Sequence, residues 1–156
     1  MRLTKTQIAL LALIVSVFGL YWTIQITQAS IDYWLEKPEA FTADFNSISV
    51  YCKNGGETDG DFNLIVTFVN ASFSNRTVKP YTQVDNSTAK FRFLLHKGES
   101  NQKIVYFTIH ENVEGFLIQL SAEKSNFYDI VKLNPMYPTK LEYRWNEQEK
   151  RFVLIG

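Results

Sequence analysis

Residues 48–71 read ISVYCKNGGETDGDFNLIVTFVNA, and this stretch decides the fold. Apolar and polar residues alternate in two runs within it: Ile48, Val50 and Cys52, then Phe62, Leu64, Val66 and Phe68. An alternation with a period of two residues is typical of β-strands that bury one face. The residues between the runs are polar and rich in glycine, so the stretch predicts two strands joined by a turn.

The same alternation recurs further along the chain. Its apolar members are Phe91, Phe93 and Leu95, then Val105, Phe107 and Ile109, then Phe116, Ile118 and Leu120. Residues 141–145 and 151–155 flank the five polar residues 146–150 and predict a hairpin. With seven to nine short strands and no long amphipathic helix, residues 41–156 are expected to form an all-β, antiparallel, immunoglobulin-like β-sandwich.

Two short motifs add a resemblance to a known family. Asn54-Gly55-Gly56 closes the first strand, and Gly60-Asp61-Phe62 opens the next. This arrangement resembles the immunoglobulin-like modules of the CARDB type in archaeal and bacterial surface proteins, where Asn-x-Gly ends a strand and Gly-x-Phe begins its successor. The resemblance covers residues 48–71 and implies a fold more than a function. The cysteine pair of antibody domains is absent, which excludes that branch of the class.

The N-terminal stretch is apolar and long. No charged residue occurs from Thr6 to Ile31, and a helix over residues 6–28 would rise about 34 Å, enough to cross a hydrocarbon core of about 30 Å. Arg2 and Lys5 precede it, so the positive-inside rule predicts a cytoplasmic N-terminus. We therefore expect a signal-anchor helix at 1–28, contacting the lipid bilayer through 6–28, a juxtamembrane tether at 29–40 and an extracytoplasmic domain at 41–156.

Two alternatives to a retained anchor stay open. A cleaved secretory signal would have the same basic start and apolar run, with a cleavage site at Thr27-Gln28-Ala29. A type IV pilin-like leader also begins with a hydrophobic helix before a β domain, although here no Gly or Ala processing site precedes the apolar run. Whether the helix is a retained anchor or a cleaved signal, the rest of the chain is expected to be exported.

Composition excludes several functions. Sixteen basic residues balance sixteen acidic ones and no basic stripe occurs, which disfavours nucleic-acid binding. Cys52 is the one cysteine, so no disulfide forms within the chain, and its place in an alternating run predicts a small buried apolar residue. No positioned acid, base, nucleophile or metal set can be assembled, so we expect neither catalysis nor a cofactor.

Three Asn-x-Ser/Thr sequons begin at Asn70, Asn75 and Asn86. They cluster in one polar region on the side expected to be exported, and so are predicted N-glycosylation sites. An extracellular domain without disulfides is more typical of an archaeal source than of a eukaryotic one.

Further candidate sites have simple structural explanations. Residues 57–63, ETDGDFN, place oxygen ligands around a glycine as calcium loops do, but lack the terminal bidentate Glu, so a solvated turn is expected. His96 and His110 are expected to be surface residues. One group of aromatic residues could line a binding face or serve as packing: Tyr81, Tyr128, Tyr137, Tyr143 and Trp145. Trp145 is its expected centre.

From the sequence we expect a membrane-anchored extracytoplasmic sandwich with a structural or protein-interaction role in a cell envelope, with other envelope or membrane proteins as partners. An accessory single-pass subunit of a larger membrane enzyme or transporter is the alternative. Ser16, Gly19 and Thr23 favour it, since their spacing would let a second helix approach closely.

Overall fold

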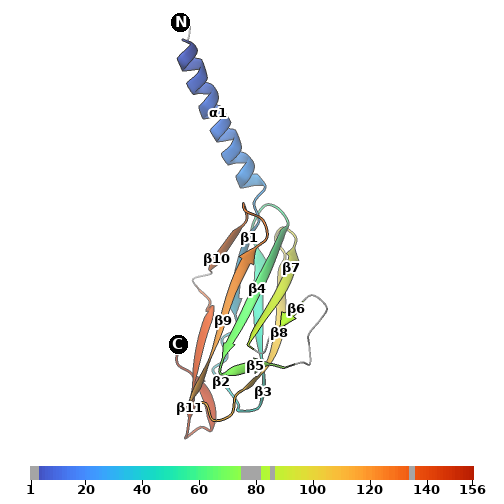
Figure 1. Cartoon of the computed structure of the whole chain (residues 1–156), viewed down its shortest axis with the longest axis vertical. Helices are drawn as coiled ribbons and strands as arrows, with labels where there is room; N and C mark the ends of the chain where they lie inside the picture. Colours follow the sequence, from blue (N-terminus) through green and yellow to red (C-terminus); the bar gives the residue numbers. More distant parts are fainter. Residues whose placement is uncertain (1–3, 75–81, 85–86, 134–135) are drawn as a thin grey trace.

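The computed structural model describes residues 4–74, 82–84, 87–133 and 136–156, and shows one helix leading into a β-sandwich (Figure 1). The helix α1 spans Lys5–Ile26. The strands of the described part are β1 (Ser30–Leu35), β2 (Ala40–Phe41), β3 (Phe45–Asn54), β4 (Gly60–Val69), β5 (Ala71–Phe73), β6 (Thr82–Val84), β7 (Thr88–Leu95), β8 (Ser100–Ile109), β9 (Gly115–Lys124), β10 (Ile130–Leu133), β11 (Lys140–Asn146) and β12 (Arg151–Leu154).

The strands form two sheets that face each other. The first has the order β10-β1-β3-β8-β5, and the second β2-β12-β11-β9-β4-β7-β6. Every described pairing is antiparallel except that of β1 with β10, which is parallel. The predicted all-β sandwich is therefore confirmed, with more strands than the sequence indicated and one parallel pair that it did not.

The predicted apolar faces meet between the sheets. Residues of β3 and β8 in the first sheet and of β4, β7 and β9 in the second are almost wholly buried on alternate positions, as the period-two pattern requires. Phe107 lies at the centre of an aromatic cluster, stacked on Phe68 at 4.7 Å and edge-on to Phe41 at 5.3 Å between ring centroids. Offset and edge-to-face ring pairs of this kind add to the stability that burial alone supplies.

Helix α1 extends from one end of the sandwich and packs against nothing in the described structure (Figure 1). Thr4 caps it: the Thr4 hydroxyl accepts from Gln7 N at 3.3 Å, and Gln7 Oε1 accepts from Thr4 N at 2.9 Å. The helix has a mean hydropathy of 2.0 over its most apolar window, and none of that window is buried. It is long and apolar enough to cross a membrane, a test that a signal sequence near an N-terminus also passes.

The predicted tether at residues 29–40 is wrong for most of its length. Strand β1 lies inside the first sheet between β3 and β10, and Ala29, Ile31 and Leu35 are buried in the core. The alternation of Ile31, Tyr33 and Leu35 faces the second sheet, so burial of these side chains stabilises a strand here. The sandwich therefore begins directly after the helix and not at residue 41.

Asn54 fastens this junction. Its side chain is fully buried, and its carboxamide oxygen accepts from Ser30 N at 3.2 Å and Gly56 N at 3.0 Å. Its amide nitrogen donates to Thr58 O at 2.8 Å and to Leu95 O at 3.2 Å. One side chain thus joins the first residue of β1, the β3–β4 turn and the end of β7, with both of its polar atoms satisfied away from water.

Gly56 in the β3–β4 turn allows residues 28–30 to approach closely. A Cβ on Gly56 would lie 2.4 Å from Ser30 N and 2.6 Å from Gln28 O, both backbone atoms. Backbone hydrogen bonds join the two segments at this place, from Gly55 N to Ser30 O at 2.7 Å and from Glu57 N to Gln28 O at 3.0 Å. Residues 27–30 are therefore held by the turn at residues 54–60, and we call this contact the junction clamp.

The clamp predicts different effects for two adjacent glycines. Gly56→Ala forces a methyl group against the backbone of the clamped segment and should lower the free energy of unfolding by about 1–3 kcal/mol. Gly55→Ala is the matched control, because a Cβ there meets nothing within 4 Å, and it should change stability by less than about 0.5 kcal/mol. Chemical unfolding of the full chain in detergent measures both, and equal stability of the two variants would contradict the clamp.

Candidate functional site

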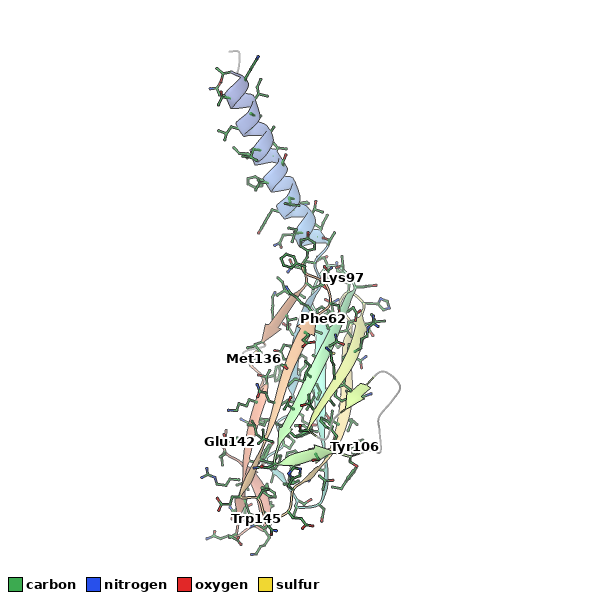
Figure 2. All side chains as sticks on the ribbon, in the orientation of Figure 1. Phe62, Lys97, Tyr106, Met136, Glu142 and Trp145 are labelled. Carbon is green, nitrogen blue, oxygen red and sulfur yellow. The ribbon has the colours of Figure 1, made fainter. Side chains whose placement is uncertain are left out.

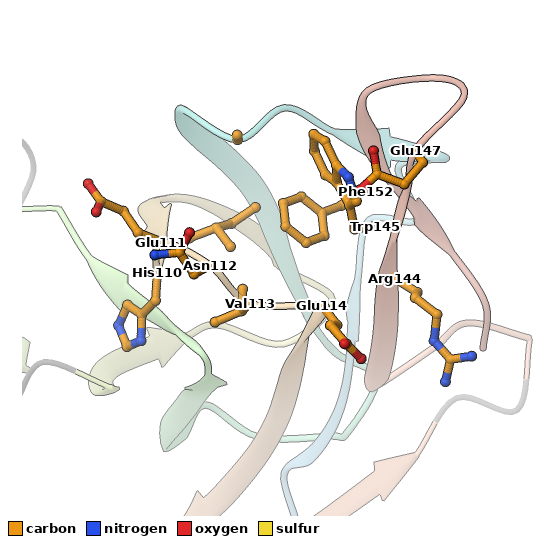
Figure 3. A pocket seen from close by; sticks show the side chains of 11 residues that line it. His110, Glu111, Asn112, Val113, Glu114, Arg144, Trp145, Glu147 and Phe152 are labelled. Carbon is orange, nitrogen blue, oxygen red and sulfur yellow. The ribbon is translucent and has the colours of Figure 1, made fainter.

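A hollow in the described structure lies at the end of the sandwich opposite the helix, which we call the far end (Figures 2 and 3). Its volume is about 710 Å³, within the range of small-ligand sites. The β8–β9 turn supplies one wall, the β11–β12 hairpin another, and Ala43 before β3 a third. The lining residues are Ala43, Ile109, His110, Glu111, Asn112, Val113, Glu114, Arg144, Trp145, Glu147 and Phe152.

The apolar part of this far-end pocket is continuous with the core. Phe152 is buried and its ring lies edge-on to Phe116 of the core at 5.3 Å and to half-buried Trp145 at 5.1 Å between centroids. Trp145 N donates to Glu114 O at 2.8 Å, which joins the β11–β12 hairpin to the β8–β9 turn. The two rings are thus held on a rigid base, and an aromatic surface of this kind suits stacking with a flat or apolar group.

The rim of the pocket is polar and mostly acidic. Three carboxylates, those of Glu111, Glu114 and Glu147, line the pocket together with one guanidinium, that of Arg144 (Figure 3). Lys150, by a hydrogen bond to the carboxylate, holds the pKa of Glu147 below its usual value, with a second contribution from a hydrogen bond of Trp145. His110 Nε2 lies 2.6 Å from Ser72 Oγ.

The five aromatic residues expected to share one face do not do so. Tyr143 is buried in the core, where it stacks on Phe116 at 4.9 Å and donates to Pro38 O at 2.8 Å. Tyr137 stacks on Trp34 at 5.2 Å on the outside of the first sheet, and Tyr128 is exposed at the helix end. Tyr81 lies outside the described residues. Of the described members of this group, Trp145 alone lines the pocket: it lies near the end of β11, whereas Tyr143 lies two residues deeper in the core on the same face of that strand.

A second group of charged side chains lies at the helix end of the sandwich. His96 Nδ1 and Asp59 Oδ2 are 2.8 Å apart, Arg92 Nη2 and Asp61 Oδ2 are 2.6 Å apart, and Lys97 pairs with Glu57. The carboxylates of the calcium-like stretch at 57–63 are therefore occupied by ion pairs. Among the residues that the structure describes, no three His, Cys, Asp or Glu side chains form a metal-binding group.

Both histidines lie at the surface, as predicted. The hydrogen bond and the charge of Asp59 raise the pKa of His96, and the hydrogen bond to His96 lowers the pKa of Asp59. This pairing was not expected, because the two residues are 37 positions apart in the sequence.

Cys52 is buried as predicted. Its side chain is 0% exposed, and burial raises the pKa of its thiol to about 12. A thiol that stays protonated near neutral pH is a poor nucleophile, so Cys52 acts as part of the core.

Of the three sequons, the structure describes the one at Asn70. This residue is exposed in the turn between β4 and β5, at a φ of 62°, and its Nδ2 donates to Gly115 O at 2.9 Å. Asn readily adopts this left-handed conformation in turns. Asn75 and Asn86 lie outside the described residues.

Comparisons with known proteins identify a fold and no family. No protein-family model matches the sequence, and no curated protein matches it. The structure resembles a non-cellulosomal cohesin from the archaeon Archaeoglobus fulgidus with a TM-score of 0.50 and 16% identity, over 80% of this chain and 95% of that one. At this identity the likeness shows a shared sandwich fold.

Two other solved structures match with lower scores. The CARDB domain of a Pyrococcus furiosus protein has a TM-score of 0.43 and 13% identity, over 76% of this chain and 85% of that one. It belongs to the module type that residues 48–71 resemble. A β-glucosidase from Kluyveromyces marxianus has a TM-score of 0.46 and 14% identity, over 81% of this chain but 15% of that one.

The Asp59–His96 pair predicts a pH-dependent contact. Because the folded pKa of His96 is raised, the pair stabilises the folded state below about pH 6.5, and this contribution is lost as the pH rises through the folded pKa. Asp59→Asn should move the midpoint of the His96 imidazole down, toward its usual value of 6.5. An NMR titration of the full chain measures the midpoint, and the same midpoint in both proteins would contradict the pairing.

Proposed function

We propose that this chain is a single-pass membrane protein whose sandwich is held outside the cytoplasm and has a structural or protein-interaction role in the cell envelope. The observation that carries the proposal is the surface of α1. Its leucine, isoleucine, valine and phenylalanine side chains are exposed all round the helix, apart from half-buried Ile24, and none of them is buried in the described structure. Water does not solvate such a surface favourably, whereas a bilayer does.

The junction clamp supports a retained anchor over a cleaved signal. Ala29 is fully buried, and its N–H donates to Asp129 Oδ1 at 3.1 Å, at a carboxylate that is 3% exposed. Cleavage after Ala29 would remove this donor from a buried charge and would place a new ammonium group at Ser30 N, beside the buried Asn54. Both changes are unfavourable, because buried charges need partners. The fold therefore favours a mature chain that contains residues 27–29.

The charge distribution around α1 supports one orientation of the helix in the membrane. Arg2 and Lys5 lie at the N-terminal side of the apolar stretch, and the first charged residue after it is Asp32. Basic residues are retained on the cytoplasmic side, so residues 1–28 act as a signal anchor with the N-terminus inside and residues 29–156 outside. Export exposes Asn70, Asn75 and Asn86 to glycosylation, which we include in the proposal.

For the interaction role we propose the far-end pocket as the recognition site. It stands at the end of the sandwich away from α1, and so at the greatest distance from the membrane (Figure 1). Trp145 and Phe152 offer a preorganised aromatic surface that requires little ordering on binding. Other envelope proteins are the proposed partners.

A second candidate function is an accessory subunit of a larger membrane enzyme or transporter. The hydroxyls of Ser16 and Thr23 donate to the backbone of their own helix, at 2.8 Å each, and a Cβ on Gly19 would meet nothing within 4 Å. This leaves a shallow small-residue face on which another helix could pack. Gel filtration after extraction in mild detergent distinguishes the two, since a subunit runs as a defined larger assembly and a lone anchor as a small particle.

The proposed topology predicts that antibody added to intact cells reaches the C-terminus of the chain but not its N-terminus. An epitope after Gly156 should bind antibody on intact cells, and an epitope before Met1 should bind only after permeabilisation. The N-terminal epitope is the matched control, because both tags sit on one chain. A C-terminal epitope that is hidden until the cells are permeabilised would contradict the proposal.

A further inference from the structure

Three turns of the sandwich lie at the helix end, and the strand pairing places them there. β10 runs parallel to β1 with Ser30 opposite Ile130, so the residues before Ile130 lie on the same side as the helix that precedes Ser30. The β9–β10 turn at 125–129 therefore points toward α1, as Figure 1 shows. The β3–β4 turn at 55–59 and the β7–β8 turn at 96–99 lie at the same end.

Only one of these three turns is apolar at its tip. The β3–β4 turn carries Glu57 and Asp59, and the β7–β8 turn carries His96, Lys97 and Glu99. The β9–β10 turn instead presents Phe127, whose side chain is 84% exposed, and Tyr128, which is 48% exposed. Adjacent aromatic side chains at this exposure are unusual for a turn in water, because they leave apolar surface unburied.

The aromatic turn is held in place by its own contacts. Lys124 Nζ donates to Phe127 O at 2.8 Å and lies 5.6 Å from the centre of the Phe127 ring. Tyr128 N donates to Asn126 Oδ1 at 3.3 Å, and the Phe127 and Tyr128 rings are edge-on at 5.5 Å. The turn therefore offers a preformed group of two aromatic rings beside one ammonium.

The turn is close to the end of α1 along the molecule. Ile130 N donates to Ala29 O at 2.9 Å, and Ala29 lies three residues beyond the last helical residue, Ile26. Trp22 is four residues further back, about 6 Å along the helix axis from Ile26. The headgroup layer on each side of a bilayer is about 5–8 Å thick, so a Trp22 at its inner edge places the end of α1, toward which the aromatic turn points, at its outer part.

We propose that the β9–β10 turn is a second membrane contact, in which Phe127 and Tyr128 enter the outer headgroup layer and Lys124 lies beside lipid phosphates. Aromatic side chains with a polar edge favour this layer, and the ammonium of a lysine reaches phosphate at the same depth. This inference rests on the proposed membrane anchoring. With two points of attachment, the sandwich stands at a defined tilt and directs the far-end pocket away from the lipid.

The test uses the full chain in phosphatidylcholine vesicles with a fluorescent probe on a Ser125→Cys variant. Ser125 is exposed in the turn, so the probe reports its depth while Phe127 and Tyr128 stay native. Lipid-borne nitroxide in the headgroup region should quench this probe strongly. The matched control is a probe on Glu147→Cys in the far-end hairpin, which the same lipids should leave unquenched. Unmodified protein is the labelling blank, because Cys52 is buried.

A second variant tests whether Phe127 and Tyr128 cause the quenching of the Ser125 probe. In the Ser125→Cys background, Phe127→Ser with Tyr128→Ser should weaken the quenching of the Ser125 probe, with an unchanged unfolding midpoint since both rings are exposed. Weak quenching at Ser125 while the protein still floats with the vesicles would overturn the second contact and leave the anchor intact. Failure to float with vesicles would instead overturn the anchor itself.

Discussion

The carboxamide of Asn54 is the interaction on which the rest of the structure depends. It is buried completely and bonds to four backbone groups, from Ser30, Gly56, Thr58 and Leu95. Each buried backbone group left without a partner costs about 1–3 kcal/mol, so this one side chain makes three segments interdependent. The close approach of Gly56 to residues 28–30 requires a residue without a Cβ at position 56.

The clamp connects the helix to the sandwich without a flexible linker. Only Thr27, Gln28 and Ala29 separate the end of α1 from β1, and Gln28 and Ala29 are buried. In the proposed topology, a protein held in this way presents one fixed end to the membrane and the other to its surroundings. The charged and aromatic turns lie at the first end, and the far-end pocket around Trp145 lies at the second. The arrangement suits a rigid module that displays one recognition surface.

Much of the sandwich could be predicted from local pattern. The alternation in residues 48–71 marks β3 and β4 because each strand has one buried face, and the polar stretch at 146–150 marks the last hairpin. β1 was missed because Ser30 directly continues a charge-free apolar stretch, so its alternation merged with the signal of the helix. Its parallel pairing with β10 joins residues 100 positions apart, which no local pattern encodes.

The candidate sites were less predictable than the strands. Trp145 was singled out by residue type, but its pocket arises because the β8–β9 and β11–β12 connections meet at one end of the sandwich. The Asp59–His96 pair and the exposure of Phe127 likewise depend on which turns share an end. Such neighbours follow from sheet order, and sheet order is determined by the packing of the whole domain.

The most direct test of the account is the intact mass of the native protein extracted from membranes. A clamp built from residues 27–30 predicts a protein whose mass includes residues 1–29, and therefore α1, plus hexose-sized increments where Asn70, Asn75 or Asn86 carries sugar. A mass that corresponds to residues 30–156 alone would show cleavage after Ala29. That result would contradict the central claim that helix and sandwich form one continuous, anchored structure.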